Sequence, residues 1–243
     1  VVDRENEIRA FVPEEYWSIE ALLQTADGGK FSARYYGDAN GKAELKNEEQ
    51  AMHVVNAVTG KPFTVGNIKR GKKKRTAAPP FITSTLQQEA SRKLNMTPRR
   101  TMSIAQELYE GIELGEYGLT GLITYMRTDS LRLADEATAA AAGFIRGRYG
   151  EEYYPGKPRV FKTKGNAQDA HEAIRPSNVQ LLPEEIRKYL TPDQFKLYRL
   201  IWSRFVACQM ADAILDTVSA DIVCEGQVFR ASGHTVAFPG FTA

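Results

Sequence analysis

The sequence has few of the residues that mark secreted, metal-binding or membrane proteins. Only two of its 243 residues are cysteines, Cys208 and Cys224, and they form no C-x-x-C pair. This spacing argues against a zinc site and against a disulfide framework, so we expect buried thiols in a reducing compartment. No apolar run approaches the roughly 20 residues of a membrane span, and no signal peptide opens the chain. These absences predict a cytoplasmic protein that binds no membrane.

Net charge is also small. It is +2 for the whole chain, so overall charge does not indicate a nucleic-acid-binding protein. Its distribution is uneven, because six lysines and arginines and no acid fall within Lys69–Arg75, which leaves −4 for the rest. Such a run is typical of a solvated loop, and a cationic segment also binds DNA without sequence preference by releasing counterions. We predict a mobile linker here that marks a domain boundary.

Length and pattern predict an α+β multidomain chain. With 42% hydrophobic residues, the chain can bury one large core or two moderate ones. Alternating apolar residues near both ends predict one β-rich domain, formed by residues 15–77 and 213–243, with turns at residues 27–29 and 225–226. The capping-box spacing of residues 47–50 predicts one helix within it. A mainly α-helical domain, residues 78–212, interrupts it. Its pattern also predicts a helix over residues 131–149, a basic linker over 157–164 and a helix capped by Thr191 and Gln194. Residues 1–14 look like the tail of a truncated helical domain without an initiator methionine. We therefore expect a piece of a longer protein.

Two helices joined by about three residues are predicted early in the helical domain. A capping-box pattern at Ser84 starts the first, and Thr97 with Pro98 starts the second. This is a helix-turn-helix geometry, although helical hairpins are also common in proteins that bind no DNA. Arg99 and Arg100 fall in the first turn of the second helix, where backbone N–H groups favour phosphate. We predict that both arginines contact DNA.

The chemical signal is strongest in residues 121–130, which read G-L-I-T-Y-M-R-T-D-S. An apolar run that we expect to form a strand leads to Tyr125, and the residues from Arg127 onward are polar. A phenol is a nucleophile when its proton has an acceptor, and a guanidinium two residues on can share an anion with it. An isolated tyrosine would more often be an aromatic side chain packed on a core. The pair predicts attack on a phosphate that Arg127 holds, and Arg127 also favours the phenolate.

A second segment, A-H-E-A-I-R-P, places His171 and Arg175 close together before a proline. Alone, a His-x-x-x-Arg pattern means little, and a structural histidine is the commoner explanation. Beside the Tyr125 segment it predicts a second set of DNA-facing residues. His171 would contact phosphate or donate a hydrogen bond near the site, and Arg175 would steady the segment. We also assign Thr128 to DNA contact and to fixing the turn after Tyr125.

Both segments, together with Phe11–Trp17 and Pro80–Glu89, resemble the bacterial type IA DNA topoisomerases. The resemblance implies the toroidal fold of that family, with CAP-like helix-turn-helix character in the helical domain. It implies that Tyr125 attacks one DNA strand and forms a transient 5′-phosphotyrosyl link. Strand passage through this break relaxes negative supercoils without ATP. The implied partner is single-stranded DNA, and the full enzyme would be a nucleoid-associated monomer.

The resemblance also implies parts that the sequence does not contain. Members of the family carry a Toprim domain whose acidic residues bind Mg²⁺, and a zinc-ribbon tail. The sequence has no Asp-x-Asp-x-Glu cluster. We expect Mg²⁺ to belong to the Toprim domain of the full enzyme and this chain to bind no metal. We also expect this chain to bind DNA without relaxing it.

Two other functions fit parts of the sequence. A non-catalytic helix-turn-helix module would use the helix pair and the basic run, and Tyr125→Phe would then change nothing. Tyrosine recombinases also combine Tyr, His and Arg, but they place the tyrosine after an H-x-x-R segment and link to the 3′ phosphate. Here Tyr125 precedes His171 and Arg175, so both order and spacing argue against a recombinase.

Overall fold

The structure is a computed structural model that describes residues 1–161 and 171–243. It is an α+β fold with an antiparallel sheet and, among the described residues, seven α-helices. Contacts divide the chain into two compact units. The first unit comprises Val1–Lys73 and Leu215–Val236, and the second comprises Lys74–Ile214 and Ala237–Ala243. We call them the sheet unit and the helical unit. The predicted α+β class is confirmed.

The sheet follows the strand order β1-β2-β8-β7-β4, with β3 beside β2. Pairing of β1 with β2 runs from Glu20↔Arg34 to Gln24↔Lys30, so the predicted hairpin is present. The turn Glu225–Gly226 joins β7 to β8, also as predicted. The strands are β1 (Glu20–Gln24), β2 (Lys30–Asp38), β3 (Gly41–Lys42), β4 (Thr64–Arg75), β7 (Ala213–Cys224) and β8 (Gln227–Phe238).

One helix supports the core of the sheet unit. It is α2 (Glu48–Val58), whose N-cap Asn47 accepts a hydrogen bond from the Gln50 amide at 3.0 Å, as the sequence predicts. Val54 of this helix packs with Phe229 of β8 in a buried cluster. The N-terminal helix α1 (Val2–Arg9) is also present and buries none of its residues.

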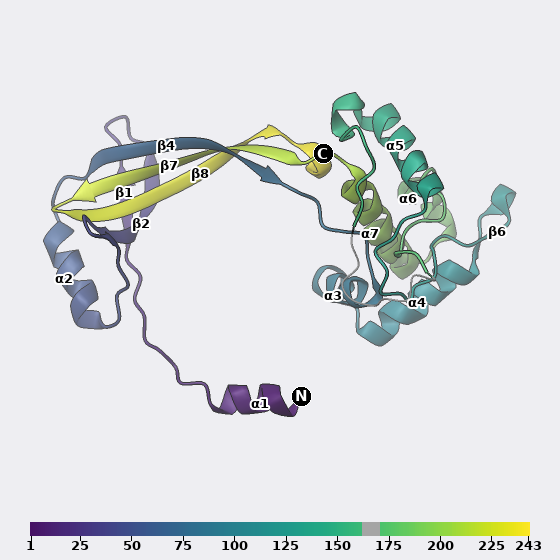
Figure 1. Cartoon of the computed structure of the whole chain (residues 1–243), viewed down its shortest axis with the longest axis horizontal. Helices are drawn as coiled ribbons and strands as arrows, with labels where there is room; N and C mark the ends of the chain where they lie inside the picture. Colours follow the sequence, from purple (N-terminus) through teal and green to yellow (C-terminus); the bar gives the residue numbers. More distant parts are fainter. Residues whose placement is uncertain (162–170) are drawn as a thin grey trace. The chain divides into compact units, whose positions relative to one another are not determined.

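The prediction of a mobile linker over Lys69–Arg75 is wrong. These residues form the second half of β4, which Figure 1 shows running beside β7 in the opposite direction. All twelve residues of β4 are exposed. Pairing with β7 satisfies the backbone along one edge, and the long cationic side chains extend into water. Lysines on an edge strand are a common way to prevent pairing with another chain.

The helical unit is built around its longest helix, α7 (Pro192–Gln209). Thr191 and Gln194 form the predicted reciprocal capping box, with bonds of 2.9 and 3.3 Å. Tyr198 and Ile201 are fully buried in one core cluster, and α7 continues into a second. The other elements are α3 (Thr83–Leu94), α4 (Pro98–Glu110), α5 (Asp135–Tyr149), α6 (Pro183–Ile186), and the short strands β5 (Ile112–Glu113) and β6 (Leu119–Thr120).

Two helix starts differ from the prediction. The first helix of the predicted pair begins at Thr83 rather than after Ser84, because the Thr85 hydroxyl accepts from the Ile82 amide at 3.0 Å. The helix expected from Leu131 begins only at Asp135. The second helix of the pair starts as predicted, with Thr97 as N-cap and proline first.

Both cysteines are free and buried, as predicted. Burial raises the pKa of the Cys208 thiol to about 12, and that of Cys224 is raised too. A thiol held protonated in this way is a poor nucleophile. Within the residues that the structure describes, no helix is both long and apolar enough to cross a membrane.

Candidate active site

Tyr125 lies in a loop whose incoming half is held by the 171–177 segment. The Thr124 amide donates to the Arg175 carbonyl at 3.0 Å. The Thr124 hydroxyl donates to the Ala173 carbonyl at 2.7 Å and accepts from the Arg175 amide at 3.0 Å. Ile123 and Pro176 form an isolated β-bridge. The predicted strand over residues 121–125 is therefore wrong, because this bridge is the only strand-like pairing described for these residues.

The outgoing half of the loop is held by the first residue of α3. The Thr83 hydroxyl donates to the Met126 carbonyl at 2.7 Å and accepts from the Thr128 amide at 2.9 Å. The Thr83 amide donates to the Thr128 carbonyl at 2.9 Å. Thr128 is itself buried, and its hydroxyl accepts from the Ser130 amide at 3.1 Å. Two threonines, Thr83 and Thr124, thus fix the backbone on both sides of Tyr125.

The ring of Tyr125 contacts two other rings. The Tyr109 ring, near the end of α4, is 5.4 Å from it, centroid to centroid, in an edge-on arrangement. The His171 ring lies 5.1 Å away on a tilted plane. Edge-on aromatic pairs are worth about 0.5–1.5 kcal/mol beyond the area that they bury. The structure therefore brings the predicted His171 beside Tyr125 and adds Tyr109, which the sequence analysis missed.

Gly121 explains how Tyr109 and Tyr125 come together. The Leu122 amide donates to the Leu108 carbonyl at 2.7 Å, so the loop returns against the end of α4. A Cβ on Gly121 would lie 2.8 Å from the Tyr109 carbonyl oxygen. Only glycine fits this close approach without a backbone shift. This glycine was the one sequence signal that could have indicated the contact.

Arg127 and Asp129, which follow Tyr125, are both exposed. Among the residues that the structure describes, no ion pair or hydrogen bond occupies the Arg127 guanidinium. An unpaired guanidinium two residues after Tyr125 is available to a phosphate.

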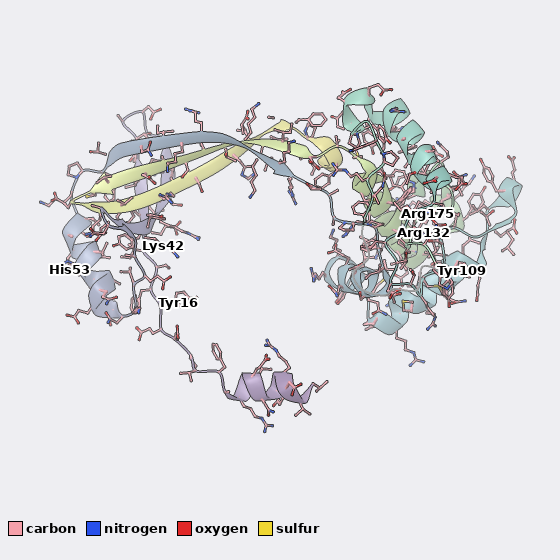
Figure 2. All side chains as sticks on the ribbon, viewed as in Figure 1. Tyr16, Lys42, His53, Tyr109, Arg132 and Arg175 are labelled. Atoms are coloured by element: carbon pink, nitrogen blue, oxygen red, sulfur yellow. The ribbon has the colours of Figure 1, made fainter. Side chains whose placement is uncertain are left out.

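Arg175 is used differently from Arg127. Its guanidinium donates to both carboxylate oxygens of Glu172, at 2.9 and 3.0 Å, and to the Pro176 carbonyl at 2.9 Å. Glu172 also accepts from the Ala134 amide at the start of α5, at 2.9 Å. Figure 2 labels Arg175 with Arg132, whose carbonyl accepts from the Ala173 amide at 2.9 Å. These contacts give Arg175 a role in shaping the segment that carries His171.

Burial acts to raise the pKa of Glu172, but this effect is outweighed. Hydrogen bonds from Arg175 and the Ala134 amide, together with the charges of Arg175 and Arg132, hold the pKa below its ordinary value of 4.5. The folded state therefore favours the carboxylate.

Glu172→Gln is expected to remove part of the pH dependence of stability. A lowered folded pKa means that the contribution of the carboxylate is present above pH 4.5 and lost as pH falls through the folded pKa. As pH falls below 4.5, the free energy of unfolding of the wild type should therefore fall more steeply than that of Glu172→Gln. The total loss should be about 1.5 kcal/mol, which is typical of hydrogen bonds to charged groups. Urea unfolding at several pH values, followed by Trp202 fluorescence in a Trp17→Phe background, measures the free energy of unfolding of both proteins. Equal slopes would contradict the prediction.

The helix-pair arginines lie apart from Tyr125. Thr97 caps α4 by accepting from the Arg100 amide at 3.3 Å, and the Arg100 guanidinium pairs with Asp193 of α7. Arg99 is exposed. Ten residues at about 1.5 Å each separate Arg99 from Tyr109 along α4, or about 15 Å. The structure does not bring Arg99 and Arg100 into the Tyr125 site.

Part of the second predicted segment lies outside the described residues. Residues 165–170 and the last three residues of the predicted linker 157–164 fall there. In the described ranges, no group of three His, Cys, Asp or Glu side chains could hold a metal ion. The residues present do not fit a Mg²⁺ site, so no chemical step is derived through that metal.

The sequence profile of the DNA topoisomerase family matches residues 1–243, which is the whole chain. The chain belongs to the bacterial type IA DNA topoisomerases. A solved structure of full-length topoisomerase I from Thermotoga maritima is 36% identical, with a TM-score of 0.76. The match covers 98% of this chain and 37% of that one. This topoisomerase chain thus spans 37% of the length of the T. maritima protein.

Proposed function

We propose that this chain carries the strand-cleaving nucleophile of a type IA topoisomerase. The observation that carries the proposal is the setting of Tyr125. Its ring contacts those of Tyr109 and His171, and its backbone is fixed on both sides. Two residues on, Arg127 is exposed and unpaired within the described chain. A positioned phenol beside a free guanidinium suits attack on a phosphodiester, because the arginine stabilises charge on the phosphoryl oxygens.

The reaction is a transesterification. The Tyr125 oxygen forms a bond to phosphorus as the bond from phosphorus to the 3′ oxygen breaks. The phenol releases its proton and the leaving 3′ oxygen takes one up, so protons balance. One phosphodiester replaces another, and the same steps in reverse rejoin the strand without ATP. In the full enzyme, strand passage through the break would relax negative supercoils.

The other site residues have supporting roles in this proposal. His171 contacts phosphate or donates a hydrogen bond beside Tyr125. Arg175 holds the segment through Glu172, and its contact with DNA is indirect. Thr128 fixes the turn, and because its amide and carbonyl both bond to Thr83, its contact with DNA is indirect. Arg99 and Arg100 bind phosphates away from the cleavage point, as part of a CAP-like helix-turn-helix.

We further propose the domain arrangement of the family toroid. Residues 15–77 and 213–243 form the arch domain, 78–212 the domain with the nucleophile, and 1–14 the tail of another helical domain. Mg²⁺ belongs to a Toprim domain that lies outside the present sequence. The chain alone binds single-stranded DNA and does not relax supercoils, and the full enzyme is a monomer of the bacterial cytoplasm.

The polarity of the covalent link tests this function. A chimera in which this chain replaces the matching 37% of T. maritima topoisomerase I is incubated with a single-stranded oligonucleotide. Alkali or detergent traps the adduct. A label at the 3′ end of the DNA should stay with the protein, whereas a label at the 5′ end should be released. Retention of the 5′ label would indicate a 3′ link and contradict the proposal, and a non-catalytic module would retain neither.

A further inference from the structure

A second set of cationic groups lies in the sheet unit, whereas Tyr125 belongs to the helical unit. Arg70 and Lys72 of β4, His234 of β8 and the hydroxyls of Thr217 and Thr235 line a shallow hollow of about 700 Å³. The other lining residues are Gly71, Asp216, Val218 and Gly233. We call this surface the cationic hollow. Its residues come from three strands that are neighbours in the sheet, β8, β7 and β4 (Figure 1).

These three strands carry a net positive charge. They contain seven lysines and arginines against two aspartates, a net charge of +5, compared with +2 for the whole chain. Every residue of β4 and residues 232–237 of β8 are exposed. A concentration of one charge on exposed backbone attracts a polyanion and raises its association rate.

The cations of the hollow are weakly neutralised. Among the described residues, no ion pair occupies Arg70, and Lys72 reaches Asp216 only at 3.9 Å. Both of those side chains are largely exposed, at 76% and 52%, and exposed pairs of this kind contribute about 0–1 kcal/mol. A phosphate can therefore displace Asp216 as the partner of Lys72 at little cost.

The two faces of β4 differ. Arg70 and Lys72 share one face because they are two residues apart, and Lys69 and Lys73 share the other. Lys69 on that other face interacts with the carboxylate of Asp221. A hydrogen bond from Arg230 lowers the pKa of Asp221, and the charge of Lys69 lowers it further. The two faces therefore carry cations in different surroundings, and removing two charges from each allows them to be compared.

The hollow contains phosphate ligands but no platform for a base. Guanidinium, ammonium and hydroxyl groups line it, and Gly233 leaves the backbone open, with space where a Cβ would stand. None of its lining residues is Phe, Tyr or Trp. Sites for single strands combine a basic groove with aromatic side chains on which bases stack. A duplex keeps its bases stacked inside and presents phosphates, which is what this surface can bind.

We propose that the cationic hollow binds the phosphate backbone of duplex DNA, as a site separate from the single-strand site at Tyr125. The inference rests on the proposed function only in taking DNA as the ligand. Contacts are to phosphates, so binding has no sequence preference and weakens steeply with salt.

Fluorescence anisotropy of the 243-residue chain with a labelled 20-base-pair duplex tests the site. Arg70→Gln/Lys72→Gln removes two charges from the hollow face. The matched control, Lys69→Gln/Lys73→Gln, removes two from the opposite face of the same strand. The hollow variant should lower the slope of log K against log salt by about 1.8 and weaken duplex binding at least about tenfold at low salt. The control should stay within about threefold, and a labelled single strand should bind both variants as it binds the wild type.

Three results would overturn the inference. Equal losses in both variants would mean unlocalised attraction by net charge. An equal loss for the single strand would place that ligand in the hollow. No loss in either variant, with more aggregation, would mean that the lysines only protect the strand edge. Failure of the proposed function is separable, because adduct formation by the chimera depends on Tyr125 and duplex affinity does not.

Discussion

Tyr125→Phe is expected to abolish the covalent DNA adduct and to leave DNA binding and stability nearly unchanged. Phenylalanine keeps the ring contacts with Tyr109 and His171 but has no oxygen to attack phosphorus. Loss of a catalytic nucleophile typically lowers the rate by about 10⁴-fold or more. The rate of adduct formation by the T. maritima chimera on a 3′-labelled oligonucleotide gives the measurement. Anisotropy of the 243-residue chain with a single strand should change by less than about twofold.

Tyr117→Phe is the matched control for this variant. It makes the same chemical change at a tyrosine that is 71% exposed, in the short 3₁₀ turn Gly115–Tyr117. Adduct formation should be unaffected. If Tyr125→Phe still formed the adduct, another residue would be the nucleophile and the proposed chemistry would be wrong.

Arg175→Met is expected to destabilise the helical unit by about 2–4 kcal/mol. The change leaves the Glu172 carboxylate without its bidentate partner, and the two side chains are only 12% and 23% exposed. Breaking a buried pair in this way costs about 3–5 kcal/mol, and partial exposure reduces that figure. Urea unfolding followed by Trp202 in a Trp17→Phe background reports on the helical unit, since the chain has only these two tryptophans.

Two further variants make this result interpretable. Glu172→Gln combined with Arg175→Met should recover part of the loss, because no unpaired charge remains. Arg187→Met breaks the pair with Glu184 at the same sequence spacing, where the side chains are 67% and 61% exposed. That change should cost less than about 1 kcal/mol. A cost equal to that of Arg175→Met would mean that packing of the arginine stem, not the carboxylate contact, is responsible.

Elements that depend on local contacts were predicted well. The helices capped by Asn47, Thr97 and Thr191 begin where the sequence predicts, because each cap bonds to an amide three residues on. The terminal strands and their turn were also predicted, since alternation and a glycine turn are local signals. The candidate residues Tyr125, His171 and Arg175 could also be singled out from the sequence, because each lies in a short continuous segment of distinctive residues.

Elements that depend on contacts with distant parts of the sequence were not predicted. Residues 121–125 read as a strand, but the hydrogen bonds of Thr124 go to the 171–177 segment and form no ladder. The same reason hid Thr83, Thr124 and Tyr109, whose roles arise only when three segments far apart in the sequence meet. Nothing in the spacing of these residues indicates which backbone group each will bind.

The basic strand shows a different kind of error. Lysine has a low intrinsic preference for strands, so Lys69–Arg75 reads as a loop. Pairing with β7 overrides that preference, as tertiary contacts commonly do for strands. A charge run therefore predicts exposure, which was right, but does not predict whether the backbone is extended and paired.

The hydroxyl of Thr83 connects two parts of the helical unit mechanically. It belongs to the first residue of α3 and holds the carbonyl of Met126, next to Tyr125. A ligand that tilts α3 must therefore either move the backbone beside the phenol or break this bond. Under the proposed function, DNA binding at the helix pair and alignment of the phenol would be thermodynamically linked, and such linkage is reciprocal. DNA held correctly at Tyr125 would in turn stiffen the start of α3.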